Sequence, residues 1–469
     1  MDRQKEELRS LLGEFGQEHV LAFWDELAEE HRHSLAAQIR ALDMRLLKRL
    51  FRGTSSPEDW ASLARRAMAP PAFHLDQREH TISPEQAHRR GVDALEAGHV
   101  GVILVAGGQG TRLGFEHPKG MLAIGPVSGS SLFQILIEKI VARSRAAGMR
   151  IPLYLMTSPA THDETIDNLR ANENFGLAGE DLRVFCQGTM PAVDAQSGRL
   201  LLEDKHLLAV SPDGHGGMLA ALVTSGCLAD MRTRGVRQLF YCQVDNPLVE
   251  MCDPEFLGYH LLSNSELSTQ VVAKRTPRDK VGNVVSIDGK LRIIEYSDLN
   301  PLDDEIVTRS APDGRPIFWA GNTAIHVFDV ALLEHTTHSA GALPFHAAKK
   351  AVPHVDAAGR KVVPREANAV KFERFIFDLL PEARQAIVVE VDEAQAFAPV
   401  KNAPGEVRDT AESARRQMIA LHASWLRAAG CEVAAGVAVE ISPMFAQSAE
   451  EVAAQVPPGL VVTQPRYFC

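Results

Sequence analysis

Residues 104–120 read LVAGGQGTRLGFEHPKG, and this stretch decides the expected fold because its glycines directly follow a short apolar run. Four glycines precede Lys119 and one follows it. Glycine lets backbone N–H groups crowd around oxygen atoms, while Arg112 offers a bidentate guanidinium and Lys119 a point charge. A plain turn after a strand needs only one or two glycines. The stretch therefore predicts a phosphate-binding loop at the end of a β-strand.

Two well-known glycine motifs do not fit this loop. The P-loop requires GxxxxGK[ST], but Pro118 occupies the position directly before Lys119. The dinucleotide-binding pattern requires GxGxxG, whereas the glycines from position 108 onward are spaced GxGxxxG. The phosphate-binding loop is therefore expected to be of another type.

The chain around this loop alternates between short apolar runs and stretches with helical spacing, starting near residue 100. This alternation predicts an α/β fold with a largely parallel sheet. VGNVVSIDGKLRIIEYSDL, residues 281–299, is typical of a hairpin that turns at Asp288-Gly289. Residues before 90 show leucines at helical spacing, and Ser83 followed by Pro84 and Gln86 predicts a helix start. We expect three consecutive parts: a helical N-terminal region (1–90), a central catalytic domain (91–385) and a C-terminal domain (386–469).

The composition is that of an ordinary globular protein, with 45% hydrophobic and 23% charged residues among 469. The net charge of −11 argues against a nucleic-acid partner. No apolar run approaches about 18 residues, so we expect no membrane partner. The opening segment MDRQKEELRSLL is too charged for a signal peptide, and the six cysteines form no CxxC pair. These features predict a cytoplasmic protein.

The glycine loop also carries a resemblance to a known family. VAGGQGTRLG followed by PKG resembles the signature of the UTP:sugar-1-phosphate uridylyltransferases, above all the eukaryotic-type UDP-N-acetylhexosamine (N-acetylglucosamine) pyrophosphorylases. The resemblance continues in order through FCQGTMPAV (185–193), SPDGHGGM (211–218), YCQVDNPLV (241–249), VGNVVSIDGKLRIIEYSDL (281–299), AGNTAIH (320–326), AVKFERFIFDLL (369–380) and FAPVKNA (397–403). It implies a Rossmann-like, GT-A-like nucleotidyltransferase core with a mixed sheet, preceded by a helical region and followed by a small C-terminal domain built around β-structure.

The reaction that the resemblance implies is attack of a sugar-1-phosphate oxygen on the α-phosphorus of UTP, giving a UDP-sugar and pyrophosphate. The nucleophile and the leaving group are both anions, so the protein must supply cations and in-line alignment. A phosphomonoester is mostly ionised at neutral pH, so no general base is needed. This agrees with a sequence in which we find no Ser-His-Asp or Cys-His signature.

Asp245 ends the apolar run LFYCQVD, and a carboxylate at the carboxyl end of a strand in an α/β sheet lies where ligands bind. It predicts a site for Mg²⁺ or Mn²⁺, because Mg²⁺ commonly takes one or two carboxylates plus phosphate oxygens. The resemblance implies the remaining roles. Gly107, Gly108, Gly110, Gln187 and Gly214 bind the nucleotide, Arg112, Lys119 and Lys401 are catalytic, and Lys371 binds a phosphate.

The residues expected to contact the sugar are His215, Asn246, Glu295 and Asn322. The N-acetylhexosamine enzymes typically read PDGNGG where this chain reads PDGHGG. His215 thus replaces an asparagine, as in many relatives that act on UDP-glucose or on UDP-sugars broadly. The expected substrate is N-acetylglucosamine-1-phosphate, and a UDP-glucose or UDP-sugar pyrophosphorylase of broader specificity is the alternative.

Other functions remain open at this point. An enzyme of the same fold could use another base, and a non-catalytic UDP-sugar-binding protein would need no complete clamp for the leaving group. Arg112, Lys119, Asp245 and Lys401 together argue against such a binder. We expect UTP, a sugar-1-phosphate and a UDP-sugar as partners, and a monomer or weak homo-oligomer.

Overall fold

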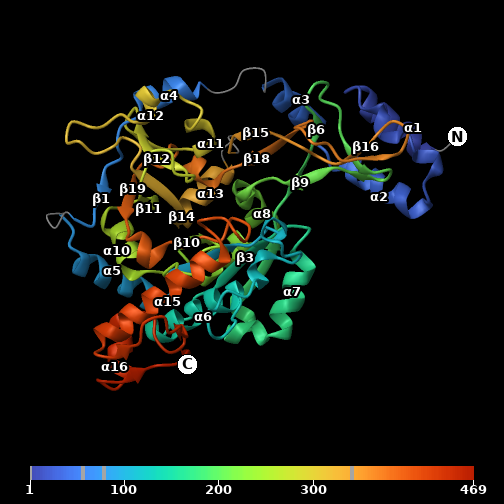
Figure 1. Ribbon diagram of the computed structural model, residues 1–469. Helices are drawn as coiled ribbons and strands as arrows, with labels where there is room; N and C mark the ends of the chain where they lie inside the picture. Colours follow the sequence, from blue (N-terminus) through green and yellow to red (C-terminus); the bar gives the residue numbers. More distant parts are fainter. Residues whose placement is uncertain (1–2, 54–58, 77–80, 339–342) are drawn as a thin grey trace. The chain divides into compact units, whose positions relative to one another are not determined.

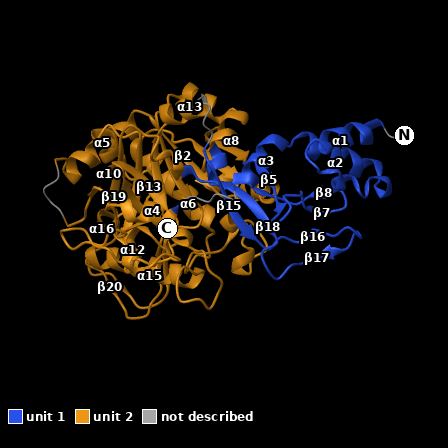
Figure 2. Cartoon of the chain, turned by 90° about the horizontal axis from the view of Figure 1, so that it is seen from above, with its two compact units in different colours: residues 1–59, 187–218, 343–376 blue, residues 60–186, 219–342, 377–469 orange. Residues whose placement is uncertain are grey.

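The computed structural model describes residues 3–53, 59–76, 81–338 and 343–469, which fall into two compact units (Figure 2). Unit 1 combines residues 1–59, 187–218 and 343–376, and unit 2 combines residues 60–186, 219–342 and 377–469. The three consecutive parts expected from the sequence therefore do not coincide with these units. Each unit joins segments that are far apart in the chain, and local patterns carry no signal for such joining.

Unit 1 is built from N-terminal helices and short antiparallel strands. Its helices are α1 (Arg3–Gly13), α2 (Glu29–Arg40) and α3 (Met44–Gly53), with 3-10 turns at Glu18–Leu21 and Trp24–Glu26. Its main sheet has the order β15 (Phe345–Lys350), β18 (Ala369–Arg374), β6 (Val193–Asp194). Three ribbons pair β5 (Thr189–Pro191) with β9 (Val210–Pro212), β7 (Leu202–Asp204) with β8 (Leu207–Leu208), and β16 (His354–Val355) with β17 (Lys361–Val362).

The core of unit 1 explains why its three segments belong together. Leu8, Trp24 and Leu35 of the N-terminal segment are fully buried in one cluster with Val370 and Phe372 of β18. Amphipathic helices of this length gain most of their stability from packing such an apolar face. The helical N-terminal region thus depends on a strand more than 300 residues later in the chain.

Unit 2 contains a large mixed sheet, which confirms the expected α/β fold class (Figure 1). The strand order is β1 (Ala72–Phe73), β19 (Ala386–Glu390), β11 (Leu267–Ala273), β14 (Ala320–Asp329), β10 (Gln238–Gln243), β2 (Val100–Val105), β3 (Leu153–Thr157), β4 (Leu182–Cys186). Along this order only β14 runs antiparallel to its neighbours. The carboxyl ends of β10 and β2 therefore meet at the same edge of the sheet.

Helices and smaller strands complete unit 2. The helices are α4 (Trp60–Arg66), α5 (Pro84–Glu96), α6 (Leu132–Ala147), α7 (His162–Ala171), α8 (Met218–Thr224, which begins at the boundary), α9 (Cys227–Arg234), α10 (Pro254–Leu262), α11 (Tyr296–Leu299), α12 (Asp304–Val307), α13 (Val330–His338), α14 (Glu393–Ala396), α15 (Ala411–Ala428) and α16 (Ala449–Gln455). The C-terminal strands β20 (Glu432–Val433), β21 (Val439–Ile441), β22 (Val461–Val462) and β23 (Arg466–Phe468) form two small parallel pairs beside α15 and α16.

Two local predictions are confirmed in unit 2. The Ser83 hydroxyl accepts a hydrogen bond from the Gln86 N–H (3.2 Å), and the Gln86 side chain accepts one from the Ser83 N–H (2.9 Å), so a capping box starts α5. β12 (Asn283–Ile287) and β13 (Lys290–Ile294) form the expected hairpin. Asp288 (φ 51°) and Gly289 (φ 79°) both have positive φ, as a two-residue hairpin turn of this type requires.

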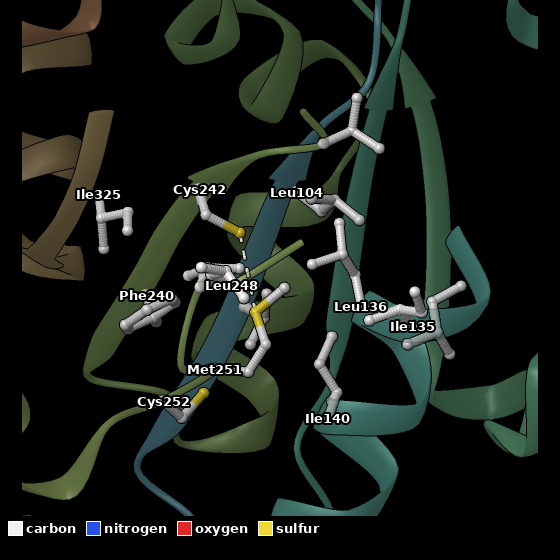
Figure 3. Close-up of a cluster of buried hydrophobic side chains, with 14 of the residues drawn as sticks. Leu104, Ile135, Leu136, Ile140, Phe240, Cys242, Leu248, Met251, Cys252 and Ile325 are labelled. Atoms are coloured by element: carbon white, nitrogen blue, oxygen red, sulfur yellow. Dashed lines mark hydrogen bonds between the residues drawn. The ribbon is translucent and has the colours of Figure 1, made fainter. Parts of the chain in front are cut away.

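The core of unit 2 lies between the sheet and α6 (Figure 3). Leu104 of β2 and Phe240 of β10 pack in one buried cluster with Leu136 and Ile140 of α6, and Met251 closes the cluster. All five side chains are fully buried. This packing fixes the strands whose ends carry the candidate site.

Candidate active site

The glycine loop leaves the end of β2 and folds back on itself. The Gly110 N–H donates to the His117 carbonyl (2.9 Å), and the Lys119 N–H donates to the Gly108 carbonyl (3.1 Å). The Ser158 hydroxyl donates to the Gly107 carbonyl (2.7 Å) and anchors the loop to the segment after β3. Hydrogen bonds within the protein therefore fix the conformation of the loop.

The glycines of this loop have different reasons to be glycine. A Cβ on Gly110 would lie 2.6 Å from the Phe115 carbonyl oxygen, and one on Gly120 would lie 2.3 Å from the Phe133 ring. These two glycines are required by the packing of the protein itself. A Cβ on Gly108 would meet no atom within 4 Å, and its φ is not positive. Gly108 thus exposes bare backbone to open space, as a loop that approaches a ligand closely would.

Lys119 and Asp245 come together at the edge of the sheet where β2 and β10 end. The Lys119 ammonium lies 3.6 Å from the Asp245 carboxylate, and both side chains are mostly buried, 19% and 11% exposed. β2 and β10 are parallel with Val105 opposite Gln243, so both site residues follow the carboxyl ends of neighbouring strands. Arg112 is exposed and has no hydrogen-bond or ion-pair partner among the residues that the structure describes.

Lys401 belongs to a segment that lies directly against Asp245. The Val400 N–H donates to the Asp245 carbonyl oxygen (2.9 Å), and the Lys401 ammonium lies 5.7 Å from the centre of the Phe397 ring. The structure therefore brings Lys401 into the neighbourhood of the Lys119–Asp245 pair.

The Asn246 side chain forms three hydrogen bonds with backbone groups, and its expected contact with the sugar stays a prediction. Its amide N–H donates to the Ala396 carbonyl (2.8 Å), and its side-chain oxygen accepts from the N–H groups of Ala398 (3.0 Å) and Leu248 (3.2 Å). The residue is 3% exposed. It ties the segment that carries Lys401 to the end of β10, because a polar side chain can satisfy backbone groups as well as a ligand.

Glu295 and Asn322 are brought together around Gly282. The Asn322 N–H donates to the Gly282 carbonyl (2.8 Å), and a Cβ built on Gly282 would lie 3.0 Å from the Glu295 carboxylate and 3.7 Å from the Asn322 Cβ. Glu295 and Asn322 are polar side chains beside one glycine, as expected of a pocket that binds sugar hydroxyls, and the Asn322 side-chain oxygen accepts a hydrogen bond from the Ala324 N–H (3.0 Å). Their contact with sugar stays a prediction.

Lys274 lies next to this pair, and no motif of the sequence distinguishes it from other lysines. Its ammonium donates to the Pro277 carbonyl (2.6 Å) and to the Asn283 side-chain oxygen, and its stem lies against Gly321. Burial lowers the pKa of Lys274 to about 8. A lone lysine in a sequence is normally a solvated charge, so no pattern distinguishes it.

Four further predicted residues lie in unit 1: Gln187, Gly214, His215 and Lys371. Gln187 directly follows β4 and is 8% exposed, and its side-chain amide has no hydrogen-bond partner in the described part of the chain. Such an amide is available to pair with the edge of a base. Lys371 is partly buried on β18, opposite Ala348 of β15.

His215 is held as a neutral ring. The Ile376 N–H donates to His215 Nδ1 (3.1 Å), and the ring stacks on Phe375 with centres 5.4 Å apart. Burial, with a smaller contribution from His346, lowers the pKa of His215 to about 4. Because Nδ1 accepts a hydrogen bond and the ring is neutral at pH 7, the proton resides on Nε2.

The glycines beside His215 serve packing rather than open access. A Cβ on Gly214 (φ 83°) would lie 2.4 Å from the Arg374 carbonyl oxygen, and one on Gly217 would lie 2.0 Å from the Asp213 carboxylate. The Arg374 guanidinium pairs with the Asp213 carboxylate, and the Arg374 N–H donates to the Asp213 carbonyl (2.8 Å). The PDGHGG segment is thus fastened to the end of β18, and α8 begins right after it.

Asp245 provides a single carboxylate for a divalent cation, so substrate phosphates would have to supply further ligands. The described residues contain no group of three or more His, Cys, Asp or Glu side chains placed to hold a metal ion. Asp245 offers one carboxylate at the sheet edge, beside Lys119. One carboxylate combined with substrate phosphates is a common arrangement for Mg²⁺.

Comparison with known proteins identifies the family of the chain. The family model of UTP--glucose-1-phosphate uridylyltransferase matches residues 47–413. The chain belongs to this family, so the resemblance read from its motifs is confirmed.

Individual relatives extend the match over nearly the whole chain. UDP-N-acetylhexosamine pyrophosphorylase-like protein 1 of Xenopus tropicalis is 36% identical over 451 residues, covering 92% of this chain and 87% of the relative. UDP-N-acetylglucosamine pyrophosphorylase of Saccharomyces cerevisiae is 35% identical over 390 residues, covering 82% and 81%. The crystal structure of uridine diphosphate N-acetylglucosamine pyrophosphorylase from Trypanosoma brucei shares the fold, with a TM-score of 0.82 at 24% identity and 99% of each chain covered.

The helices of the described residues include none that is long and apolar enough to cross a membrane. All six cysteines lie in the described part of the chain, and none of them forms a disulfide there.

Proposed function

We propose that this chain is a uridylyltransferase that converts UTP and N-acetylglucosamine-1-phosphate to UDP-N-acetylglucosamine and pyrophosphate. The observation that carries the proposal is the Lys119–Asp245 pair, 3.6 Å apart, at the ends of parallel strands β2 and β10. Membership of the uridylyltransferase family and relatives named for UDP-N-acetylglucosamine support the same reaction.

The cations of unit 2 perform the chemistry in this proposal. Arg112, which is exposed and has no partner among the described residues, and Lys119 neutralise the phosphates that leave as pyrophosphate. Asp245 would hold Mg²⁺ or Mn²⁺, and the bound cation would neutralise phosphate oxygens. Lys401 supplies a further positive charge to the phosphates. Fixed charges aimed at the transition state are the usual source of rate enhancement in phosphoryl and nucleotidyl transfer.

Polar side chains orient the bound nucleotide and sugar, and none of them has to transfer a proton in the reaction. The Gln187 amide, which has no hydrogen-bond partner among the described residues, pairs with the uracil edge, and Gly108 lets the loop backbone approach the nucleotide. Glu295 and Asn322 hold sugar hydroxyls, and the Nε2–H of His215 donates a hydrogen bond in place of an asparagine amide. The six cysteines form no disulfide among the described residues, which supports a cytoplasmic location.

A second candidate is a UDP-glucose or UDP-sugar pyrophosphorylase of broader specificity. The observation that favours it is His215 at a position where N-acetylhexosamine enzymes have asparagine. Both candidates share the clamp for UTP and differ only in the sugar.

The test is pyrophosphate release from UTP and Mg²⁺ with a panel of N-acetylglucosamine-, N-acetylgalactosamine-, glucose- and galactose-1-phosphate. Turnover with the N-acetylated sugars supports the proposal, and turnover restricted to glucose or galactose supports the second candidate. Lys119→Met is the control, because a methionine of similar length removes the charge that the reaction needs. Absence of turnover with every sugar, together with intact UDP-sugar binding, would instead identify a non-catalytic binder.

A further inference from the structure

The segment that carries Lys401 is fixed on both sides by backbone hydrogen bonds. On one side, the Val400 N–H donates to the Asp245 carbonyl oxygen (2.9 Å). On the other side, the N–H groups of Lys401 (2.7 Å) and Asn402 (2.8 Å) both donate to the Asp409 carbonyl oxygen. Three successive N–H groups thus hold the backbone of Lys401 between two aspartates.

Asp409 can present its carbonyl in this way because its backbone is left-handed, with φ 56°. Side chains other than glycine, asparagine and aspartate rarely adopt this conformation. The turn closes residues 401–409 into a loop, and the Asn402 side chain adds a hydrogen bond to the Arg408 carbonyl (2.9 Å). With this backbone conformation, the Asp409 carbonyl accepts the hydrogen bonds from the Lys401 and Asn402 N–H groups.

The turn is anchored from behind by α15. Thr410 is the N-cap of this helix: its hydroxyl accepts from the Ser413 N–H (3.0 Å), and the Ser413 hydroxyl accepts from the Thr410 N–H (2.9 Å). Thr410 is 3% exposed. A capped helix of 18 residues therefore holds the residue next to Asp409 in place.

The Asp409 carboxylate also lies among the charges of the site. Burial raises the pKa of Asp409, the charges of Lys401 and Arg408 act in the opposite direction, and Asp245 adds to the rise. The side chain is therefore near both Lys401 and Asp245, in addition to the backbone contact.

We propose that Asp409 is a positioning residue that places Lys401 at the phosphates by means of its left-handed turn. The inference rests on the proposed function, in which the Lys401 ammonium contacts the phosphates of the substrates. Asp409 itself need not touch substrate: its carbonyl holds the Lys401 backbone, and the capped start of α15 holds Asp409.

The first test replaces Asp409 with residues that differ in their tolerance of positive φ. Asp409→Val, a β-branched side chain that the left-handed region excludes, should lower kcat for pyrophosphate release at least about tenfold, or about 1.4 kcal/mol, with a smaller effect on the KM for UTP. Asp409→Gly and Asp409→Asn permit the turn and should retain most of the turnover. If Asp409→Gly loses as much as Asp409→Val, the carboxylate and not the turn is what matters, and the inference is wrong.

The second test asks whether Asp409 acts through Lys401. Lys401→Ala alone should lower turnover at least about tenfold. If Asp409 acts only by placing Lys401, Asp409→Val should cause no further loss of kcat in the Lys401→Ala background. Independent effects that multiply in the double variant would overturn the inference, because separate defects in folding or chemistry add in free energy.

The matched control is Asp288→Val. Asp288 also has positive φ (51°) in unit 2, but it lies in the β12–β13 turn, where its exposed ion pair with Arg66 contributes little. This variant should lose thermal stability to a similar extent as Asp409→Val and keep the wild-type kcat. If wild-type protein releases pyrophosphate but Asp409→Val keeps full kcat, only this inference fails; if wild-type protein releases none with any sugar, the proposed function fails first.

Discussion

His215 is the residue whose identity bears most directly on the choice of sugar. Its ring is neutral, its Nδ1 is occupied by the Ile376 N–H, and its proton is on Nε2. Nε2–H is a single hydrogen-bond donor, whereas an asparagine amide provides two donors and an acceptor. The difference between the two side chains is therefore a defined change in hydrogen-bonding capacity.

We expect His215→Asn to raise the preference for N-acetylglucosamine-1-phosphate over glucose-1-phosphate about tenfold, the worth of roughly one hydrogen bond in kcat/KM. His215→Leu should lower kcat/KM for both sugars and leave the KM for UTP nearly constant. His346→Asn, a change at the neighbouring histidine that stacks on Phe375, is the control and should leave the sugar preference unchanged. An unchanged sugar ratio in His215→Asn would show that position 215 does not read the sugar.

Single polar residues also mark the limit of what sequence can predict at this scale. Asp245 and Lys119 could be selected because each ends or follows a strand, and the structure brings them to 3.6 Å. Asn246, next in the chain, has its side chain bonded to the backbone of residues 396–398. The partner of the Asn246 amide lies about 150 residues away in the chain. A local sequence pattern therefore cannot predict which groups this amide contacts.

The place of the glycine loop directly after a strand was predicted correctly, because it depends on neighbouring residues, while its binding of phosphate stays a prediction. The hairpin at Asp288-Gly289 was predicted for the same reason. The individual glycines could not be distinguished, since their roles depend on atoms such as the Phe133 ring and the Phe115 carbonyl. Ser158, which anchors the loop through the Gly107 carbonyl, carries no signal in the sequence.

Two alanine variants separate these roles within one loop. Gly108→Ala should leave the free energy of unfolding nearly unchanged, because its Cβ meets open space, and should lower turnover because the Cβ would stand where substrate approaches. Gly120→Ala should lower the free energy of unfolding by about 1–3 kcal/mol, because its Cβ meets the buried Phe133 ring. Urea denaturation and pyrophosphate release measure the two effects. Full activity in Gly108→Ala would contradict a close approach of substrate at this position.

At the scale of the whole molecule, the sequence indicated a mixed α/β fold but not its partition into units. Residues 187–218 and 343–376 join the N-terminal helices because β6 pairs with β18, about 175 residues apart along the chain. Periodicity identifies a strand but does not identify its partner. The C-terminal part was expected to rest on β-structure, and after β19 and α14 it consists of α15 and α16 with two pairs of short strands.

The stability of the whole chain should depend on pH through His422 of α15. The Ile441 N–H donates to His422 Nδ1 (3.2 Å), and burial, with a contribution from Lys139, lowers the pKa of His422 to about 3. His422 of the unfolded chain takes up a proton near pH 6.5, whereas the buried His422 of the folded chain does not. The contribution of His422 to the free energy of unfolding is therefore fully present above pH 6.5 and decreases as pH falls toward 3. Between pH 7 and pH 5 this one group should remove about 2 kcal/mol from the free energy of unfolding.

Urea denaturation at pH 7 and pH 5 tests this expectation. His422→Asn keeps an acceptor for the Ile441 N–H without a titratable ring, so its loss of stability between the two pH values should be smaller by about 2 kcal/mol. His33→Asn, a change at an exposed histidine of α2, should lose as much as the wild type. Equal losses in His422→Asn and the wild type would show that His422 is not the responsible group.

The chain passes between the two units five times, at residues 59/60, 186/187, 218/219, 342/343 and 376/377. During synthesis, α1 to α3 leave the ribosome first, but their buried partners Val370 and Phe372 emerge about 320 residues later. At typical rates of 5–20 residues per second, this delay lasts roughly 16 to 64 seconds. Throughout that interval the apolar faces of the first three helices have no native partner on β18. The nascent chain therefore needs protection early, and a ribosome that stalls before residue 370 would release a fragment with an unfinished core.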